Sequence, residues 1–169
     1  MKKANPMETI EYRTIDKSTW GNGPWQNEPD KVQFPDPETG MPCLIVSVGH
    51  SGHLCGYVGV TEGHPYYKKG GYDHDVSVHG GITFTSMCAP SEDEGHGICH
   101  VPGPGEPDHV WWLGFDCAHY LDFAPAMAVT LGKLPGDHSW MEGDIYRTVD
   151  YVKSEIASLA KQLKEIGNA

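Results

Sequence analysis

The chain has few basic residues and no long apolar segment. No stretch approaches the roughly 20 uninterrupted apolar residues of a membrane-spanning helix, and the N-terminal lysines are not followed by the apolar segment of a secretory signal. Lys and Arg number 12 against 23 Asp and Glu, which gives a formal net charge of -11. Because nonspecific nucleic-acid affinity comes mainly from basic side chains that neutralise phosphates, we expect neither a membrane nor duplex DNA or RNA as a partner.

Closely spaced cysteine pairs are absent as well. The five cysteines are an odd number, and none belongs to a Cys-x-x-Cys motif of the kind found in structural zinc sites and thioredoxin-like centres. We therefore expect most of them to be reduced thiols and the protein to be cytoplasmic, since thiols stay reduced in the cytosol. The residues are Cys43, Cys55, Cys88, Cys99 and Cys117.

Turn-forming residues, by contrast, are abundant. The 169 residues include 21 Gly and 13 Pro, which indicates many turns and few long helices. The length suits a single domain over residues 1–169 that is large enough to bury a core. Residues 1–40 have little apolar periodicity and many turn formers, so we expect an ordered N-terminal arm wrapped over the body.

The strand signals lie within residues 41–125, where we expect the sheet and the site. Two runs rich in β-branched residues, 43–48 and 54–60, flank a Gly-bounded turn and predict a hairpin. Alternation with a period of two predicts a further strand over residues 76–84, and the apolar run 110–115 predicts a central strand.

Only the C-terminus has a clear helical pattern. Apolar residues repeat at spacings of three and four over residues 147–166, so one face of a helix there should pack on the sheet. Residues 89–109 are rich in Gly, Pro and acidic residues and predict a long loop. The predicted fold class is therefore α+β: a twisted, mainly antiparallel sheet with long loops and a C-terminal helix packed on one face.

Histidines and carboxylates mark the candidate site. Asp116, His119 and Asp122 recur every third residue after a predicted strand, and on a helical turn these side chains would share one face. His79 lies before a double glycine in another apolar run. We predict that these four residues hold a divalent metal, zinc or manganese, because mixed imidazole and carboxylate ligands suit such ions. Ordinary hydrogen-bonding roles are the alternative, since the chain lacks a short metal signature such as His-Glu-x-x-His.

Further residues are assigned to the same predicted pocket. His64 and His100 are candidates for acid–base catalysis or substrate contact, because imidazoles titrate near neutrality. We expect His50 and His53, at the tip of the predicted hairpin, to be solvated turn residues. The candidate ligand-binding residues combine a glycine backbone with aromatic walls: Gly80, Gly81, Tyr57, Trp111 and Trp112.

A cysteine nucleophile is an alternative chemistry. Cys117 lies two residues before His119, and Cys99 directly precedes His100, so a thiol beside an imidazole base is conceivable. The competing interpretation is that such cysteines are small buried apolar residues. An esterase of the nucleophile-elbow type is set aside, because the chain has no Gly-x-Ser-x-Gly motif.

Three sequence blocks resemble a family of small proteins encoded by bacteriophages and prophages. They are Gly56-Tyr57-Val58-Gly59-Val60 followed by Gly63-His64-Pro65, Val78-His79-Gly80-Gly81-Ile82-Thr83-Phe84, and Gly114-Phe115-Asp116-Cys117-Ala118-His119 followed by Asp122. The likeness spans roughly residues 20–165. It implies a context, the cytoplasm of an infected host bacterium, where compact phage proteins often disable host defences or alter nucleotide metabolism. It implies no role for any particular residue.

These observations lead to three functional hypotheses. The first is a metal-dependent hydrolase that acts on a small nucleotide-derived or phosphorylated molecule. The second is a non-catalytic protein that binds and sequesters a small ligand, such as a nucleotide signal of host defence. The third is an inhibitor that blocks a host enzyme through its acidic surface.

Overall fold

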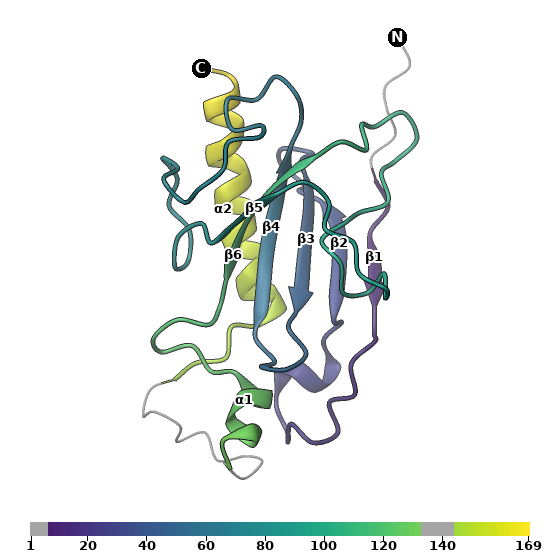
Figure 1. The fold of residues 1–169 in the computed structure, drawn as a ribbon, viewed down its shortest axis with the longest axis vertical. Coiled ribbons are helices and arrows are strands. Elements are labelled where there is room, and N and C mark those ends of the chain that lie inside the picture. The colour runs from purple at the N-terminus through teal and green to yellow at the C-terminus, as the bar shows by residue number, and fades with distance from the viewer. Residues whose placement is uncertain (1–6, 133–143) are drawn as a thin grey trace.

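The computed structural model describes residues 7–132 and 144–169, and a six-stranded sheet forms its centre (Figure 1). The strand order is β1-β2-β3-β4-β6-β5, and all neighbouring strands are antiparallel. The predicted α+β class with an antiparallel sheet is confirmed. The elements are β1 Ile10–Tyr12, η1 Pro24–Asn27, β2 Lys31–Pro35, β3 Pro42–Ser47, β4 Leu54–Val60, β5 Phe84–Ser86, β6 Trp111–Asp116, α1 Pro125–Thr130 and α2 Val149–Gly167.

Helix α2 covers one face of the sheet (Figure 1). Its N-cap, Thr148, accepts a hydrogen bond from the backbone N–H of Tyr151 (3.2 Å), which satisfies one of the free donors of the first turn. Gly56 of β4 lets the helix approach closely, because a Cβ atom there would lie 2.9 Å from Val152. The apolar face predicted from the spacing is buried: Val149, Val152, Ile156, Leu159, Ala160 and Leu163.

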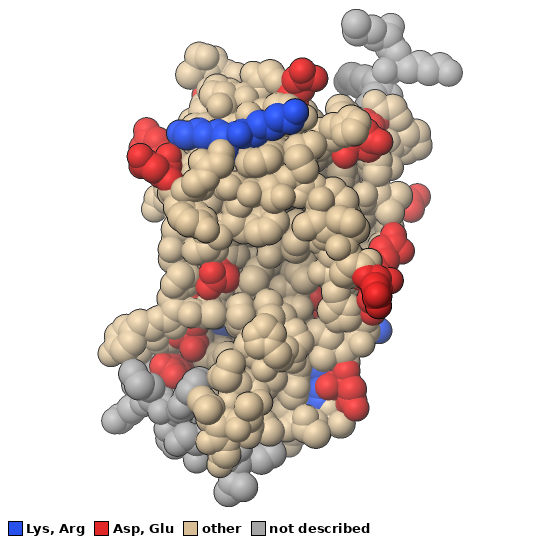
Figure 2. Space-filling view, in the orientation of Figure 1, with Lys and Arg blue, Asp and Glu red and all other residues tan. Residues whose placement is uncertain are grey.

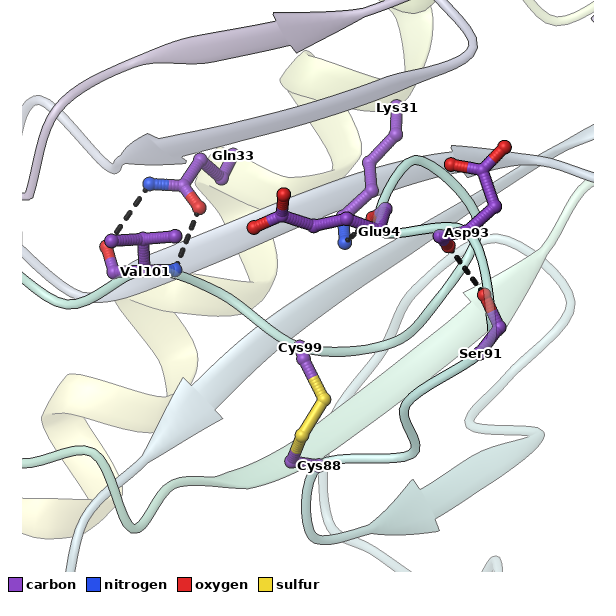
Figure 3. Close-up of a disulfide and its surroundings, with 8 residues drawn as sticks. All are labelled: Lys31, Gln33, Cys88, Ser91, Asp93, Glu94, Cys99 and Val101. Atoms are coloured by element: carbon purple, nitrogen blue, oxygen red, sulfur yellow. Dashed lines mark hydrogen bonds between the residues drawn. A yellow bond between two sulfur atoms is a disulfide. The ribbon is translucent and has the colours of Figure 1, made fainter. Parts of the chain in front are cut away.

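A long loop, residues 87–109, covers the opposite face of the sheet. The Gln33 side chain exchanges two hydrogen bonds with the backbone of Val101 (3.1 and 2.8 Å; Figure 3). Lys31 is only 1% exposed, and its Nζ donates to the carbonyl oxygen of Glu94 (2.7 Å). The loop thus closes a second core, whose buried residues are Leu44, Val46, Cys55, Tyr57, Val110 and Trp112.

A disulfide between Cys88 and Cys99 ties this loop together (Figure 3). Ala89 and Ile98 exchange two backbone hydrogen bonds of 3.0 and 2.9 Å, which bring the two ends of the intervening segment side by side. Most of the five cysteines are free, as expected, and this pair is the exception, which the spacing of the cysteines did not indicate. The remaining cysteines are free and buried: Cys43, Cys55 and Cys117.

The predicted N-terminal arm contributes more to the fold than an outer wrapping. Strand β2 lies inside the sheet, between β1 and β3. Lys31 and Gln33 alternate with Val32 and Phe34, a pattern typical of a strand with one solvent-exposed face. Both faces of β2 are nevertheless buried. The polar face is covered because its side chains bond to the backbone of the loop 87–109.

The strand predicted over residues 76–84 is largely replaced by irregular chain. Pairing with β6 involves only Phe84–Ser86. Upstream, the Gln162 side chain of α2 accepts from the N–H of Ser77 and donates to its carbonyl oxygen, each at 2.8 Å. Because α2 satisfies these backbone groups, this segment follows the helix and carries His79 towards it.

The surface in Figure 2 agrees with the acidic composition. Acidic side chains are scattered over this face and basic ones are few. Within residues 7–132 and 144–169, no helix has the length and apolar character needed to cross a membrane. The exclusion of duplex nucleic acid as a partner stays a prediction.

Candidate functional site

The fold gathers the four predicted metal ligands at one end of the sheet. His79 Nε2 lies 2.7 Å from Asp122 Oδ2, and His119 Nε2 lies 3.2 Å from Asp116 Oδ1. The two imidazole rings are 6.0 Å apart between centroids. We call His79, Asp116, His119 and Asp122 the cluster. It joins residues from two separate parts of the sequence: the irregular segment before β5, and the end of β6 with the turn directly after it.

Asp122 is the centre of the cluster's hydrogen bonds. Its carboxylate accepts from His79 Nε2 (2.7 Å), from the Nε of Arg147 (2.9 Å) and from the backbone N–H of His119 (3.0 Å). Burial on its own would raise the pKa of Asp122, but these donors outweigh it and hold the pKa below its usual value. The hydrogen bond to Asp122 raises the pKa of Arg147 in turn, so both partners are charged at neutral pH.

His79 is held on both sides of its ring. Its Nδ1 lies 2.7 Å from the hydroxyl of Tyr151, and that hydroxyl donates to Glu155 Oε1 (3.1 Å). With the opposite nitrogen bonded to Asp122, neither ring nitrogen is free to meet a ligand. Helix α2 therefore fixes the orientation of His79.

His119 has a different environment, at the edge of the cluster. Its ring packs against Gly80, whose φ of 69° is in the left-handed region and whose missing side chain leaves room for the ring. The side chain is 37% exposed, and its carboxylate partner Asp116 is held by the hydroxyl of Thr83 (2.9 Å). His119 is thus an accessible imidazole with a fixed carboxylate beside it.

A single strained turn, from His119 to Asp122, orients the side chains of both residues. The N–H of Asp122 donates to the carbonyl of His119 (2.9 Å), and Leu121 between them has a φ of 71°. This conformation is unfavourable for a side chain with a Cβ atom, and residues held in it cluster at functional sites. The turn is fixed further by the N–H of Ile145, which donates to the carbonyl of Leu121 (2.8 Å).

His119 and Asp122 also line a cavity of about 430 Å³. Its walls come from the turn between β3 and β4, the 118–122 segment, α1 and the segment before α2. We call this cavity the pocket. The lining residues are His50, Ser51, His53, Ala118, His119, Tyr120, Leu121, Asp122, Ala124, Met127 and Asp144.

The turn between β3 and β4 supplies residues that the sequence analysis assigned to solvent. His50 is exposed as expected, but His53 is half-buried and Ser51 is buried. The Ser51 hydroxyl lies 2.7 Å from His53 Nδ1. Burial lowers the pKa of His53, so its ring is neutral at pH 7. The hairpin itself was predicted. The packing of α1 on it was not, because a helix of six residues is too short to show a periodic apolar pattern.

Several other predicted site residues lie elsewhere. His64 Nε2 bonds to the carbonyl of Leu163 (2.7 Å) and its Nδ1 accepts from the N–H of Tyr66 (3.0 Å), so this ring attaches the end of α2. His100 packs edge-on against Trp112, with ring centroids 5.2 Å apart. His64 and His100 line a separate cavity of about 270 Å³ at the other end of β4, so the fold does not join them to the cluster.

Of the predicted ligand-binding residues, the glycines lie near the cluster and the aromatic residues lie away from it. Gly80 touches His119, and Gly81 follows it with a φ of 80°. Tyr57 and Trp112 are buried in the second core, and Trp111 packs against the core beneath α2. These aromatic residues do not line the pocket.

The geometry does not favour a cysteine nucleophile. Cys99 is in the disulfide. Cys117 is buried, and burial raises its pKa well above the usual value, as it raises the pKa of Cys55 to about 12. Thiols in such environments are poorly nucleophilic because the thiolate is disfavoured.

The cluster is not a ready metal site. In the part of the chain that the structure describes, no three His, Cys, Asp or Glu side chains are arranged to hold a metal ion. The reason is that His79 and Asp122 already use their ligating atoms in hydrogen bonds. Zinc or manganese binding stays a prediction.

The sequence analysis missed the partners that hold the cluster. Tyr151 and Glu155 come from α2 and Arg147 from the segment just before it, all distant from Asp122 in the sequence. No local spacing connects them to the histidines. The only available signal was that a helix packed on the sheet would bring its polar side chains to one end of that sheet.

Comparison with known proteins gives no relative. No family model, no curated protein and no solved structure matches the chain. The resemblance to bacteriophage proteins therefore stays a prediction.

Proposed function

We propose that the protein is a hydrolase that acts on a small molecule bound in the pocket. The observation that carries this proposal is the pair formed by His119 and Asp116, in which an accessible imidazole lies 3.2 Å from a fixed carboxylate at the wall of a cavity. Such a pair suits general acid–base catalysis, because the carboxylate orients the imidazole and stabilises its protonated form.

The two parts of the cluster have different roles in this mechanism. His119 accepts a proton from the attacking group and returns it to the leaving group, while Asp116 keeps the ring in place. Asp122 and His79 form a rigid support, since Asp122 holds the backbone N–H of His119 and is itself held by Arg147. The support matters because general bases act only within hydrogen-bond reach of the proton that they remove.

The pocket also has a surface for the uncharged part of a substrate. Its volume of about 430 Å³ falls within the range of small-molecule sites. Apolar side chains from the segment after β6 and from α1 line part of its wall, beside the imidazole, hydroxyl and carboxylate groups. These apolar residues are Ala118, Leu121, Ala124 and Met127.

The substrate class comes from the resemblance to phage proteins. That context favours nucleotide-derived or phosphorylated molecules, including signals of host defence, and makes them the first compounds to test. A non-catalytic binding protein for the same molecules is the competing function. The two differ in whether the bound molecule is recovered intact.

The test compares hydrolysis by the wild type and by His119→Gln over a panel of nucleotide-derived, phosphorylated and ester compounds. We expect the wild type to convert at least one compound and His119→Gln to lose about 100-fold or more in kcat. His109→Gln is the matched control, because His109 is 82% exposed in the loop 87–109 and pairs only with Asp108.

Two outcomes would contradict the proposal. One is a ligand that binds the pocket and is recovered unchanged, which favours the binding protein. The other is hydrolysis that His119→Gln and His109→Gln affect equally. Circular dichroism of both variants shows whether the fold is retained.

Metal dependence is checked separately, since no step above uses a metal. Protein purified without added metal is analysed for zinc and manganese, with His119→Ala as the comparison. The prediction from the sequence expects roughly one ion per chain in the wild type and its loss in the variant. A metal-free wild type with full hydrolytic activity would remove that prediction.

A further inference from the structure

Ser51 and His53 form a second pair of reactive groups in the pocket, away from the cluster's own hydrogen bonds. The Ser51 Oγ lies 2.7 Å from His53 Nδ1, and both residues line the cavity. A hydroxyl within hydrogen-bond reach of an imidazole is the geometric signature of a nucleophile with its base. Neither residue has a part in the acid–base mechanism of His119.

The turn that carries this pair is held rigidly. The carbonyl of Ser51 accepts from the N–H of Met127 in α1 (3.0 Å), and the N–H of Gly52 donates to the carbonyl of Val48 (2.6 Å). Gly52 has a φ of 86°, and a Cβ atom there would lie 2.9 Å from Pro125. Because only glycine fits, α1 packs directly on the turn and fixes the Ser51 backbone from both sides.

The surroundings keep His53 in the form that a base requires. Burial is the main influence on this ring and disfavours its charged form. The charged and titratable groups that face it are the carboxylates Asp116 and Asp122 and the imidazoles His50 and His119. A half-buried, neutral imidazole beside a buried hydroxyl is ready to accept its proton.

We propose that Ser51 is a nucleophile, activated by His53, which attacks an uncharged carboxylic ester in the pocket. This inference rests on the proposed function only in that the pocket is hydrolytic. It adds a covalent intermediate, and in place of the phosphorylated molecules that the resemblance favours it assigns an uncharged carboxylic ester as the substrate.

The reaction has two balanced steps. Ser51 Oγ forms a bond to the ester carbonyl carbon while its proton passes to His53 Nδ1, and the carbon–oxygen bond to the alcohol breaks as the alcohol takes that proton. A water molecule then attacks the acyl-Ser51 carbon, gives a proton to His53 and releases the acid, and Ser51 regains the proton. The sum is ester and water to acid and alcohol.

The lining of the pocket favours an uncharged bond over a phosphate ester. Among the described residues, no Lys or Arg lines the cavity, whereas Asp122 and Asp144 do. Arg147 is the nearest cation to the cluster and is bound to Asp122. A phosphoryl group would meet carboxylates without a cation to balance its charge.

The test uses covalent serine probes on the full chain. The protein is incubated with diisopropyl fluorophosphate and with phenylmethylsulfonyl fluoride, both small enough for a buried hydroxyl, and the adduct is located by peptide mass spectrometry. We expect one adduct, on Ser51, that is lost in Ser51→Ala and kept in Ser158→Ala, a control on the exposed side of α2.

The role of His53 gives a second readout. His53→Gln should slow labelling of Ser51 by about tenfold or more, because no base remains to take the proton. Since burial lowers the pKa of His53, the ring is neutral above about pH 6.5, the usual histidine value. The labelling rate of the wild type should therefore be constant above that pH and fall only in more acidic solution. No adduct on Ser51 with either probe, or labelling that His53→Gln leaves unchanged, would overturn the inference.

Labelling and turnover separate this inference from the proposed function. If Ser51→Ala still hydrolyses a substrate that His119→Gln cannot, the acid–base mechanism stands and the nucleophile is rejected. If Ser51 is labelled but His119→Gln retains full turnover, the nucleophile stands and the role of His119 is rejected.

Discussion

Asp122 connects more of the candidate site than any other single side chain. It is 1% exposed and joins His79, Arg147 and the backbone of His119. Replacing it by Asn would leave the partly buried Arg147 guanidinium without its charged partner. We expect Asp122→Asn to lower the free energy of unfolding by about 2–3 kcal/mol, measured by urea denaturation. Asp150→Asn, an exposed carboxylate in the first turn of α2, should cost only about 0.5 kcal/mol.

The same residue gives a prediction for pH. Its folded pKa is depressed, so its contribution to stability is full above its unfolded value of about 3.9 and is lost as the pH falls through the folded value. Between pH 5 and pH 3, the wild type should therefore lose stability more steeply than Asp122→Asn. Parallel curves of unfolding free energy against pH for the two proteins would show that this carboxylate is not responsible.

Gly80 and Gly81 form a matched pair for testing the position of His119. Both have positive φ, so alanine at either position costs about 1–2 kcal/mol of backbone strain. Only at Gly80 would the new Cβ also meet the His119 ring; at Gly81 it meets open space. We expect Gly80→Ala to be the less stable variant and to change the NMR chemical shifts of the His119 ring, with Gly81→Ala changing stability alone. Equal effects of the two variants would mean that the contact has no importance.

Residue types near the site could be predicted, but their roles could not. The spacing of Asp116, His119 and Asp122 predicted that these side chains lie near one another, because one turn of chain places them together. What each atom bonds to depends on Arg147 and Tyr151, and these come from an element distant in sequence. From the sequence, His64 is as good a candidate as His119, whereas in the fold both of its ring nitrogens have hydrogen-bond partners.

At the level of elements, the disulfide gives the clearest prediction. It joins Cys88 and Cys99 across a sequence separation of 11, which limits the freedom of the unfolded chain. Removing it by the double replacement Cys88→Ser and Cys99→Ser should lower the free energy of unfolding by about 3 kcal/mol in urea denaturation. A reductant should destabilise the wild type by a similar amount and leave the double variant unaffected; sensitivity of the variant would point to another cause.

The elements themselves were predictable where the pattern was local. The C-terminal helix follows a spacing that no strand would satisfy, and it begins at Val149, two residues after the predicted start. The hairpin of β3 and β4 was likewise set by two apolar runs and a glycine turn. Strand β2 escaped prediction because Lys31 and Gln33 imitate a solvent-facing side, although the loop 87–109 covers them.

On the scale of the whole molecule, the pocket is built from elements that are distant from one another in the sequence. The turn between β3 and β4, the end of β6 and α1 supply its walls. Arg147, just before α2, and Tyr151, within α2, hold the cluster in place. Such a cavity cannot be deduced from sequence periodicity, because periodicity reports which face of an element is buried and not which elements meet.

The attachment of His79 to both α2 and Asp122 has a thermodynamic consequence. Since α2 and Asp122 of the pocket share these bonds, we expect the pocket to keep its shape only while the core beneath α2 is intact. A genuine ligand should thus protect the entire molecule against heat, by about 2.7 kcal/mol at a concentration 100 times its Kd. Compound libraries can accordingly be screened by melting temperature alone, and amide protons deep in β4 should exchange more slowly whenever the cavity is filled.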